Sequence, residues 1–245
     1  MPQHRPLYIV ASPQPRVGKT LIARLLIEFL LSNDRHLIGY DLHPREPALA
    51  THFPKLVRTA DIADTLGQMA LFDELLAEDI CTTVIDLGYG LFEQFFAVLG
   101  EIGFEYEALL RRLTPVVLFV TDSARTTART YAELQSRLPH ITFVPVHNEG
   151  TSVIFSSKDF PPTRAEYGII RIPRLSPIVR GVIDRPRFSF RAYMDKQPGG
   201  PNEVHGWINS IFTEFLELEL RLLIGRFGSS LDADSESEPR KAQKG

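Results

Sequence analysis

The residues with the clearest chemical potential are Gly18, Lys19 and Thr20, which end a loop between an apolar run and an amphipathic helical pattern. In a phosphate-binding loop, backbone N–H groups surround one phosphate, a lysine reaches the β- and γ-phosphate oxygens, and a hydroxyl holds Mg²⁺. The spacing therefore predicts a site for a nucleotide with Mg²⁺, and a chance VGKT on an ordinary strand, turn and helix is the alternative. The predicted N–H donors are those of Val17, Gly18, Lys19, Thr20 and Leu21.

The first half of this loop departs from the full phosphate-loop pattern. Gly-x-x-x-x-Gly-Lys-Thr requires a glycine where this chain has Pro13, and Pro15 removes one N–H and one flexible position. The donors that matter most come from the end of the loop, which is intact. We therefore expect phosphate binding to persist.

Two acids follow apolar runs that have the character of buried strands. Asp41 ends the run HLIGYD, and Asp86 ends the run TTVID. The carboxyl ends of parallel strands meet at one sheet edge, so we expect Asp86 to lie beside the loop as a second Mg²⁺ carboxylate. A helix-capping role is the alternative for such an acid.

Apolar strands alternate with helical patterns through most of the 245 residues. This alternation predicts an α/β fold with a mostly parallel twisted sheet, helices on both faces and the P-loop NTPase architecture. We expect one domain over residues 1–227, closed by a long amphipathic helix over 203–223 that buries Val204, Trp207, Ile208, Ile211, Phe212, Phe215 and Leu216. Residues 228–245 have little apolar content, so a disordered polar tail is expected there.

Two further helical segments carry apolar patterns. In the first segment, the spacing predicts a helix with one apolar face formed by Ile62, Leu66, Met69, Phe72 and Leu76. The second, which follows Asp86, is apolar nearly all round, and Phe92, Phe95 and Phe96 exceed what one face of a sheet would cover. We expect these phenylalanines to form a surface for a homodimer or a protein partner, with a deep core as the alternative.

The charges are unevenly distributed, although the net charge is only −3. No Lys or Arg occurs from Asp61 to Leu110, whereas the stretch from Arg171 to Arg191 is rich in arginine. This asymmetry is consistent with an acidic partner or DNA at the basic stretch, or with two solvated faces. The absence of a long apolar run or a leader pattern predicts a cytoplasmic protein without a membrane span, and Cys81 is expected to be a small buried hydrophobe.

In their order along the chain, these motifs resemble the ParA/MinD-type ATPases over roughly residues 6 to 180. They comprise the VGKT loop, the strand-end Asp41, the D-x-x-x-G from Asp86 to Gly90, and the late Asn148. The resemblance implies ATP and Mg²⁺ as ligands, with Lys19 on the phosphates and Thr20 and Asp86 at the metal. It also implies that the Gly90 N–H senses the γ-phosphate, that Asn148 reads the adenine and that residues 171–174 flank the base.

Two departures from that family bear on catalysis. The family's signature lysine falls on Gln14, and its two following glycines fall on Pro15 and Arg16. Its D-x-D is Asp41-Leu42-His43 here, so a histidine stands where the family orients the attacking water. Lys19, Asp41, His43 and Arg16 are therefore the candidate catalytic residues, and losing a cation and an acid predicts slow hydrolysis by a nucleotide-dependent switch for a macromolecular cargo.

Three alternatives remain open from the sequence. Dethiobiotin synthetase also has a V-G-K-T loop without the double glycine, but Asp41 stands where that ATP-dependent ligase has a substrate lysine. The TraL-type conjugal transfer ATPases share a V-I-D followed by an aromatic-rich helix. The third alternative is a degenerate P-loop scaffold that acts only through protein contacts.

Overall fold

The computed structural model describes residues 5–43, 45–77, 81–152, 154–185, 188–196 and 202–236, with side chains described to residue 225. The chain forms strands and helices in the alternating order that the sequence predicts. The strands are β1 (Arg5–Ala11), β2 (Leu37–Leu42), β3 (Val57–Thr59), β4 (Thr82–Leu87), β5 (Leu113–Val120), β6 (Thr142–Asn148) and β7 (Ile170–Ile172). The helices are α1 (Lys19–Ser32), α2 (Ala48–His52), α3 (Thr65–Leu76), α4 (Phe92–Glu101), α5 (Phe104–Leu110), α6 (Arg125–Arg137), α7 (Pro177–Ile183), α8 (Phe190–Lys196) and α9 (Glu203–Glu236), with short 3₁₀ turns at Tyr89–Leu91 and Ala165–Tyr167.

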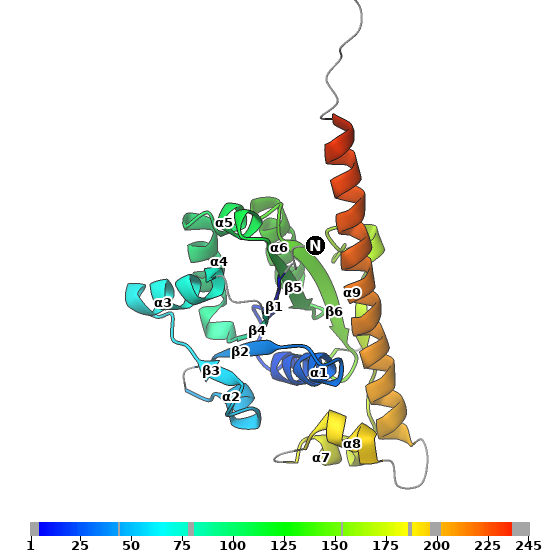
Figure 1. Ribbon diagram of the computed structural model, residues 1–245. Coiled ribbons are helices and arrows are strands. Elements are labelled where there is room, and N and C mark those ends of the chain that lie inside the picture. The colour runs from blue at the N-terminus through cyan, green and yellow to red at the C-terminus, as the bar shows by residue number, and fades with distance from the viewer. Residues whose placement is uncertain are drawn as a thin grey trace, which may run out of the picture.

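The seven strands form one sheet in the order β3-β2-β4-β1-β5-β6-β7, and every pairing is parallel. The first strand lies in the middle of the sheet between β4 and β5 (Figure 1). The loop after β1 therefore emerges beside the ends of β4 and β2. This order brings the phosphate loop and the two strand-end acids to one edge.

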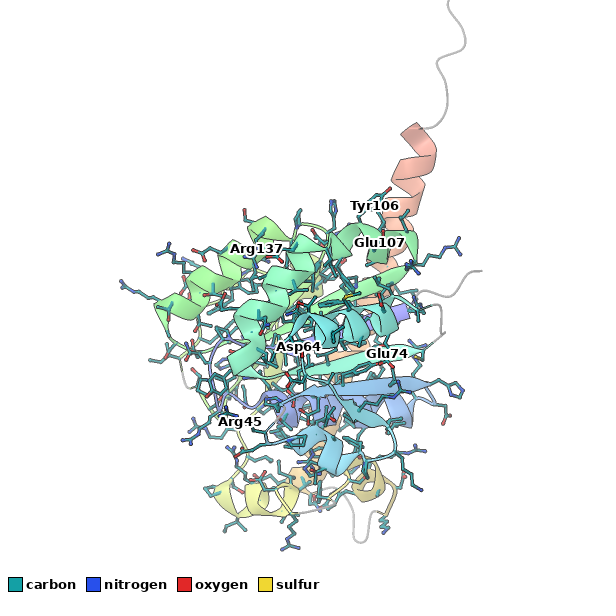
Figure 2. All side chains as sticks on the ribbon, turned by 90° about the vertical axis from the view of Figure 1, so that its left-hand side faces the viewer. Arg45, Asp64, Glu74, Tyr106, Glu107 and Arg137 are labelled. Carbon is teal, nitrogen blue, oxygen red and sulfur yellow. The ribbon has the colours of Figure 1, made fainter. Side chains whose placement is uncertain are left out.

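Helices cover both faces of the sheet, as the continuous apolar strands require. Along β1, Tyr8 and Val10 face a core shared with α1, α8 and α9, whereas Leu7 and Ile9 face a second core shared with α3, α4, α5 and α6. Figure 2 looks onto the second layer, where Tyr106 and Glu107 of α5 lie at the outer surface. The predicted α/β architecture with two covered faces is thus confirmed.

Helix α1 is fixed from behind by a buried carboxylate. Glu28 is only 3 % exposed, and its Oε2 accepts hydrogen bonds from the Ser189 hydroxyl at 2.6 Å and from the Arg191 N–H at 2.8 Å. Charge-assisted bonds of this kind are among the stronger ones in proteins. They hold the helix that begins with Lys19 against the segment leading into α8.

The predicted apolar side of α3 is wrong in two positions. Leu66 and Met69 are 78 % and 57 % exposed, whereas the helix buries Phe72, as predicted, together with Leu71 and Leu75. The helix begins only after Asp64, whose Oδ1 accepts from the Gly67 N–H at 2.7 Å, so the buried Ile62 lies outside it. A periodic pattern that runs across a helix cap loses its phase there.

The prediction that Phe92, Phe95 and Phe96 form a partner surface is wrong. All three are at most 1 % exposed and belong to the core on the α3–α6 face. Rings from two other elements contact them, because Phe72 on α3 lies 5.6 Å from Phe95 and Phe119 on β5 lies 6.2 Å from Phe92, measured between ring centroids. Phe72 in turn lies 5.6 Å from Phe104 on α5. Because α4 lies between two other helices and the sheet, its aromatic residues are covered on several sides.

Helix α9 runs along one side of the molecule and extends past the sheet (Figure 1). It buries Trp207, Ile208 and Phe215 as predicted, but Leu216 is 47 % exposed. The helix continues to Glu236, nine residues into the segment 228–245 that was expected to be disordered, and residues 237–245 lie outside the described part. Within the described residues, no helix is long and apolar enough to cross a membrane.

Candidate functional site

The loop between β1 and α1 contains a run of backbone N–H groups without an acceptor among the described residues. No described residue accepts a hydrogen bond from the N–H groups of residues 17 to 21, and the first backbone bond of the helix runs from Ile22 N to Gly18 O at 3.1 Å. Gly18 has a φ of 93°, which a side chain would disfavour, and an added Cβ would meet the Asn148 Nδ2 atom at 2.3 Å. Free N–H groups at a helix N-terminus form an anion site.

Lys19 is buried beside this loop, with 5 % of its surface exposed. Its Nζ donates to the Gln14 carbonyl at 2.8 Å and lies 5.9 Å from the centre of the Tyr89 ring. Burial lowers the pKa of Lys19 to about 8, although the charge of Asp86 opposes that shift. A cation held in this way beside free N–H groups is suited to an anionic ligand. Nothing in the sequence motif indicated the contact with Tyr89.

The hydroxyl of Thr20 donates to Oδ2 of Asp86 at 2.6 Å. Asp86 is fully buried, and its other oxygen, Oδ1, has no hydrogen-bond partner among the described residues. Burial raises the pKa of Asp86 to about 6, although His43, Thr20 and Lys19 oppose the rise. An orphaned carboxylate oxygen next to a threonine hydroxyl fits the pair of oxygen ligands that Mg²⁺ takes beside a phosphate loop.

Asp41 and Asp86 are register partners on the neighbouring strands β2 and β4. Asp41 is fully buried, and its carboxylate accepts from the backbone N–H of His43 at 3.1 Å and of Ala50 at 3.1 Å. The His43 Nδ1 lies 2.9 Å from Asp41 Oδ1 and 3.7 Å from Asp86 Oδ2. Burial lowers the pKa of His43, but the bond to Asp41 and the two negative charges outweigh it, so the pKa lies above its ordinary value.

Asn148 at the end of β6 contacts the loop between β1 and α1 from the other side. Its Nδ2 donates to the Val17 carbonyl at 3.0 Å, its Oδ1 accepts from the Gly150 N–H at 3.0 Å, and the Thr151 hydroxyl donates to the same Val17 carbonyl at 3.3 Å. The asparagine is 3 % exposed. The role visible here is to position the loop, and contact with an adenine stays a prediction. No sequence signal indicated Thr151.

The other predicted residues lie around the same edge. Gly90 is exposed in the turn after β4, with open space where a Cβ would stand, and Gly88 before it packs so closely that a Cβ would meet the Leu42 carbonyl at 2.5 Å. Gln14 directs its Nε2 to the Thr127 hydroxyl at 3.4 Å. Arg16 is exposed and has a φ of 60°. Glycine adopts such a positive φ without strain, which agrees with the glycine that the resembled family has at this position.

Three arginines of the basic stretch make local contacts. Arg174 donates to the Glu149 carbonyl at 3.0 Å, Arg191 donates to the Leu31 carbonyl at 3.1 Å, and Arg180 lies 3.7 Å from Asp184. Arg187 lies outside the described residues. Binding of an acidic partner or DNA by this stretch stays a prediction.

Comparisons with known proteins identify the fold. The chain matches the structure of a MinC:MinD cell division protein complex from Aquifex aeolicus with a TM-score of 0.51 and 14 % identity, over 86 % of this chain and 95 % of that one. A plasmid partition protein from Borrelia burgdorferi matches with a TM-score of 0.47 and 12 % identity, over 88 % of this chain and 99 % of that one. Neither protein-family profiles nor curated protein sequences match significantly. The protein thus has the α/β fold of the matched MinC:MinD complex structure, with an all-parallel sheet.

Proposed function

We propose that this protein binds ATP with Mg²⁺ at the loop from Val17 to Leu21. The observation that carries the proposal is the 2.6 Å bond between Thr20 and Asp86, beside backbone N–H groups that no described residue uses. The N–H groups and Lys19 would bind the phosphates, and Thr20 and Asp86 would hold the metal, with Asp86 acting through water. Mg²⁺ would supply charge neutralisation between the phosphate oxygens.

The remaining ligand contacts follow from the family resemblance. Gly90 stands at an exposed turn where its N–H can approach a γ-phosphate, and Asn148 and residues 171–174 lie at the ends of β6 and β7 on the same sheet edge. Because the Asn148 amide already holds the Val17 carbonyl, an adenine contact would use its second N–H or its remaining acceptor site. Base binding and loop order would then depend on one side chain.

We further propose that the protein is a slow nucleotide-dependent switch that positions, partitions or transfers a macromolecular cargo through a protein partner. Gln14 supplies no charge where the family has a lysine, and Arg16 lies exposed on the loop. Lys19 is then the one cation of the described loop residues that is buried beside the phosphate position. Nucleotide would be held for long periods, which suits a timed contact with a partner such as the one in the MinC:MinD complex.

Calorimetry with purified protein tests nucleotide binding. We expect wild type to bind ATP in Mg²⁺, and Lys19→Ala to lose a charge-assisted contact of about 1.5–3 kcal/mol, roughly ten- to a hundred-fold in affinity. Lys55→Ala removes an exposed lysine away from the loop and is the matched control. Absence of ATP binding by wild type, or equal binding by Lys19→Ala, contradicts the proposal.

A scaffold that needs no nucleotide is the second candidate, and one observation favours it. The Lys19 ammonium donates to the Gln14 carbonyl, and the His43 Nδ1 lies 2.9 Å from Asp41 Oδ1 and 3.7 Å from Asp86 Oδ2, so these groups already have partners within the chain. The same calorimetry separates the two candidates, because a scaffold that needs no nucleotide would show no heat of ATP binding, with or without Mg²⁺.

A further inference from the structure

Asp41, His43 and Asp86 form a mixed ligand set at the carboxyl ends of β2 and β4. Each offers one ligand atom, and the three atoms lie within 4.8 Å of one another. The two acids are fully buried, whereas the His43 side chain is 24 % exposed and closes the cluster toward solvent. From this arrangement we propose that the three side chains directly bind one divalent transition-metal ion of the Zn²⁺ or Co²⁺ type, without nucleotide.

The distances suit a shared cation. Around an ion bound at about 2.1 Å, neighbouring ligand atoms lie about 3.0 Å apart at right angles and about 3.4 Å apart at tetrahedral angles. The His43 Nδ1 lies 2.9 Å from Asp41 Oδ1 and 3.7 Å from Asp86 Oδ2, values that bracket this range. Small side-chain adjustments would therefore bring all three atoms to one ion.

A second observation independently indicates a missing ligand. Oδ1 of Asp86 is buried and has no hydrogen-bond partner among the described residues. An ionised oxygen left in this state is costly unless a cation or donor meets it. Thr20 donates to the other oxygen of Asp86 and Lys19 donates to the Gln14 carbonyl, so neither side chain satisfies Oδ1. An ion bound by both oxygens of Asp86 would satisfy Oδ1 and would lie between the carboxylates of Asp86 and Asp41.

The imidazole decides the class of metal. Mg²⁺ prefers oxygen ligands and keeps several waters, whereas an imidazole with carboxylates suits Zn²⁺, Fe²⁺ or Co²⁺. Nδ1 must be unprotonated to bind the ion, so the Nε2 atom carries the ring proton in the bound form. Three protein ligands leave a further position open for water or for another ligand oxygen.

This cation site goes beyond the proposed function, because it needs no nucleotide. The Mg²⁺ of the proposed function arrives with ATP phosphates and uses Thr20 and Asp86. The ion inferred here is bound through His43 and Asp41 as well. The two proposals therefore have separate readouts.

Titration of the untagged, nucleotide-free full chain with Co²⁺, followed by visible absorption, tests the inference. We expect one Co²⁺ per chain, displacement by stoichiometric Zn²⁺, and no displacement by millimolar Mg²⁺. His43→Asn keeps a polar side chain but removes the imidazole, and should weaken Co²⁺ binding by at least the roughly 10- to 100-fold typical of disturbed metal sites. His140→Asn changes an exposed histidine far along the chain and should bind like wild type.

Three results would overturn the inference: no Co²⁺ bound by wild type, equal binding by His43→Asn, or displacement by millimolar Mg²⁺. If His43→Asn does not fold, Zn²⁺ X-ray absorption on wild type still decides, because one imidazole with oxygen ligands is expected and any other histidine count contradicts the site. Calorimetry of wild type with Mg²⁺ and ATP is run in parallel. A chain that binds Co²⁺ but not ATP refutes only the proposed function, and the converse refutes only this inference.

Discussion

The hydroxyl of Thr20, in the first turn of α1, and Oδ2 of Asp86, near the end of β4, are joined by a hydrogen bond of 2.6 Å. The two residues are 66 positions apart in the chain. Because β4 is the direct neighbour of β1, the helix that follows β1 begins beside the end of β4. Sheet order thus creates the pair that would hold Mg²⁺.

Thr20→Val should separate the metal-dependent part of ATP binding from the rest. Valine has the shape of threonine without the hydroxyl, so Asp86 loses the hydrogen bond from Thr20. We therefore expect the free energy of unfolding, measured in urea, to fall by about 1–3 kcal/mol. ATP affinity should become insensitive to Mg²⁺. Thr20→Ser keeps the hydroxyl and should retain most of both properties, whereas an unchanged Mg²⁺ dependence in Thr20→Val would remove Thr20 from the metal site.

The affinity for ATP should fall as pH rises above about 8. The pKa of Lys19 in the free protein is lowered to about 8, and bound phosphates would raise it by favouring the charged form. Below that pH the lysine is charged both in the free protein and in the complex, so it contributes no pH dependence. Between the two pKa values, affinity should drop by up to about tenfold per pH unit.

Calorimetry from about pH 7 to about pH 9.5 measures this slope, with proton uptake read from buffers of different ionisation enthalpy. Lys19→Arg is the matched control, because its guanidinium stays charged over that range. A wild-type affinity that is flat to the top of the range, or an equal slope in Lys19→Arg, would show that Lys19 does not bind the phosphates as an ammonium.

The sequence was sufficient to predict the central strands and the position of the acids. Strands such as β1 and β5 are continuous apolar runs because both faces are covered. Parallel strands end at one edge, so Asp41 and Asp86 lie on neighbouring strand ends, and Asp86 lies beside the loop as expected. The three-residue strand β3 and the five-residue helix α2 were missed. Elements of that length carry too few residues to show a period.

The wrong prediction for α4 and the contacts missed at the site both concern contacts that periodicity does not encode. The sequence shows that α4 carries more aromatic side chains than one face of a sheet would cover. Whether Phe95 faces solvent or packs against Phe72 of α3 depends on how the neighbouring helices are arranged. In the same way, the bond from Asn148 to Val17 joins residues 131 positions apart and follows from the order of β1, β5 and β6. Such contacts can be recognised only in the folded structure, where the order of the strands brings the two residues together.

Phe95→Ala should destabilise the protein strongly. Phe95 is fully buried and contacts the rings of Phe72 and Phe96, so its loss leaves a cavity, and we expect about 3–5 kcal/mol in urea unfolding. Met69→Ala on the neighbouring helix changes a side chain that is 57 % exposed and should shift stability by less than about 0.5 kcal/mol. Similar small effects in both variants would show that the Phe95 side is not a packed core.

The last expectation is that hydrolysis of bound ATP is slow. Gln14 cannot neutralise phosphate oxygens in the transition state, and the His43 ring is held by Asp41 where the family resemblance implies a water-orienting carboxylate. Removing one preorganised electrostatic group typically lowers the rate about 10²- to 10³-fold, so two losses predict turnover on the order of 10⁻³ per second or less. Phosphate release in a single-turnover experiment measures it.

The paired substitution Gln14→Lys with His43→Asp restores the family pattern at both positions and should raise the rate at least about tenfold, because the lysine would place a cation beside the reacting phosphate and the carboxylate would orient the attacking water. Lys55→Ala, remote from the loop, should leave the rate unchanged. Arg16 is the residue that would overturn this account, since it lies on the loop with its side chain exposed. Wild-type turnover of several per second that is abolished by Arg16→Ala would mean that Arg16 supplies the missing cation on ligand binding, and that the protein is a rearranged but competent ATPase.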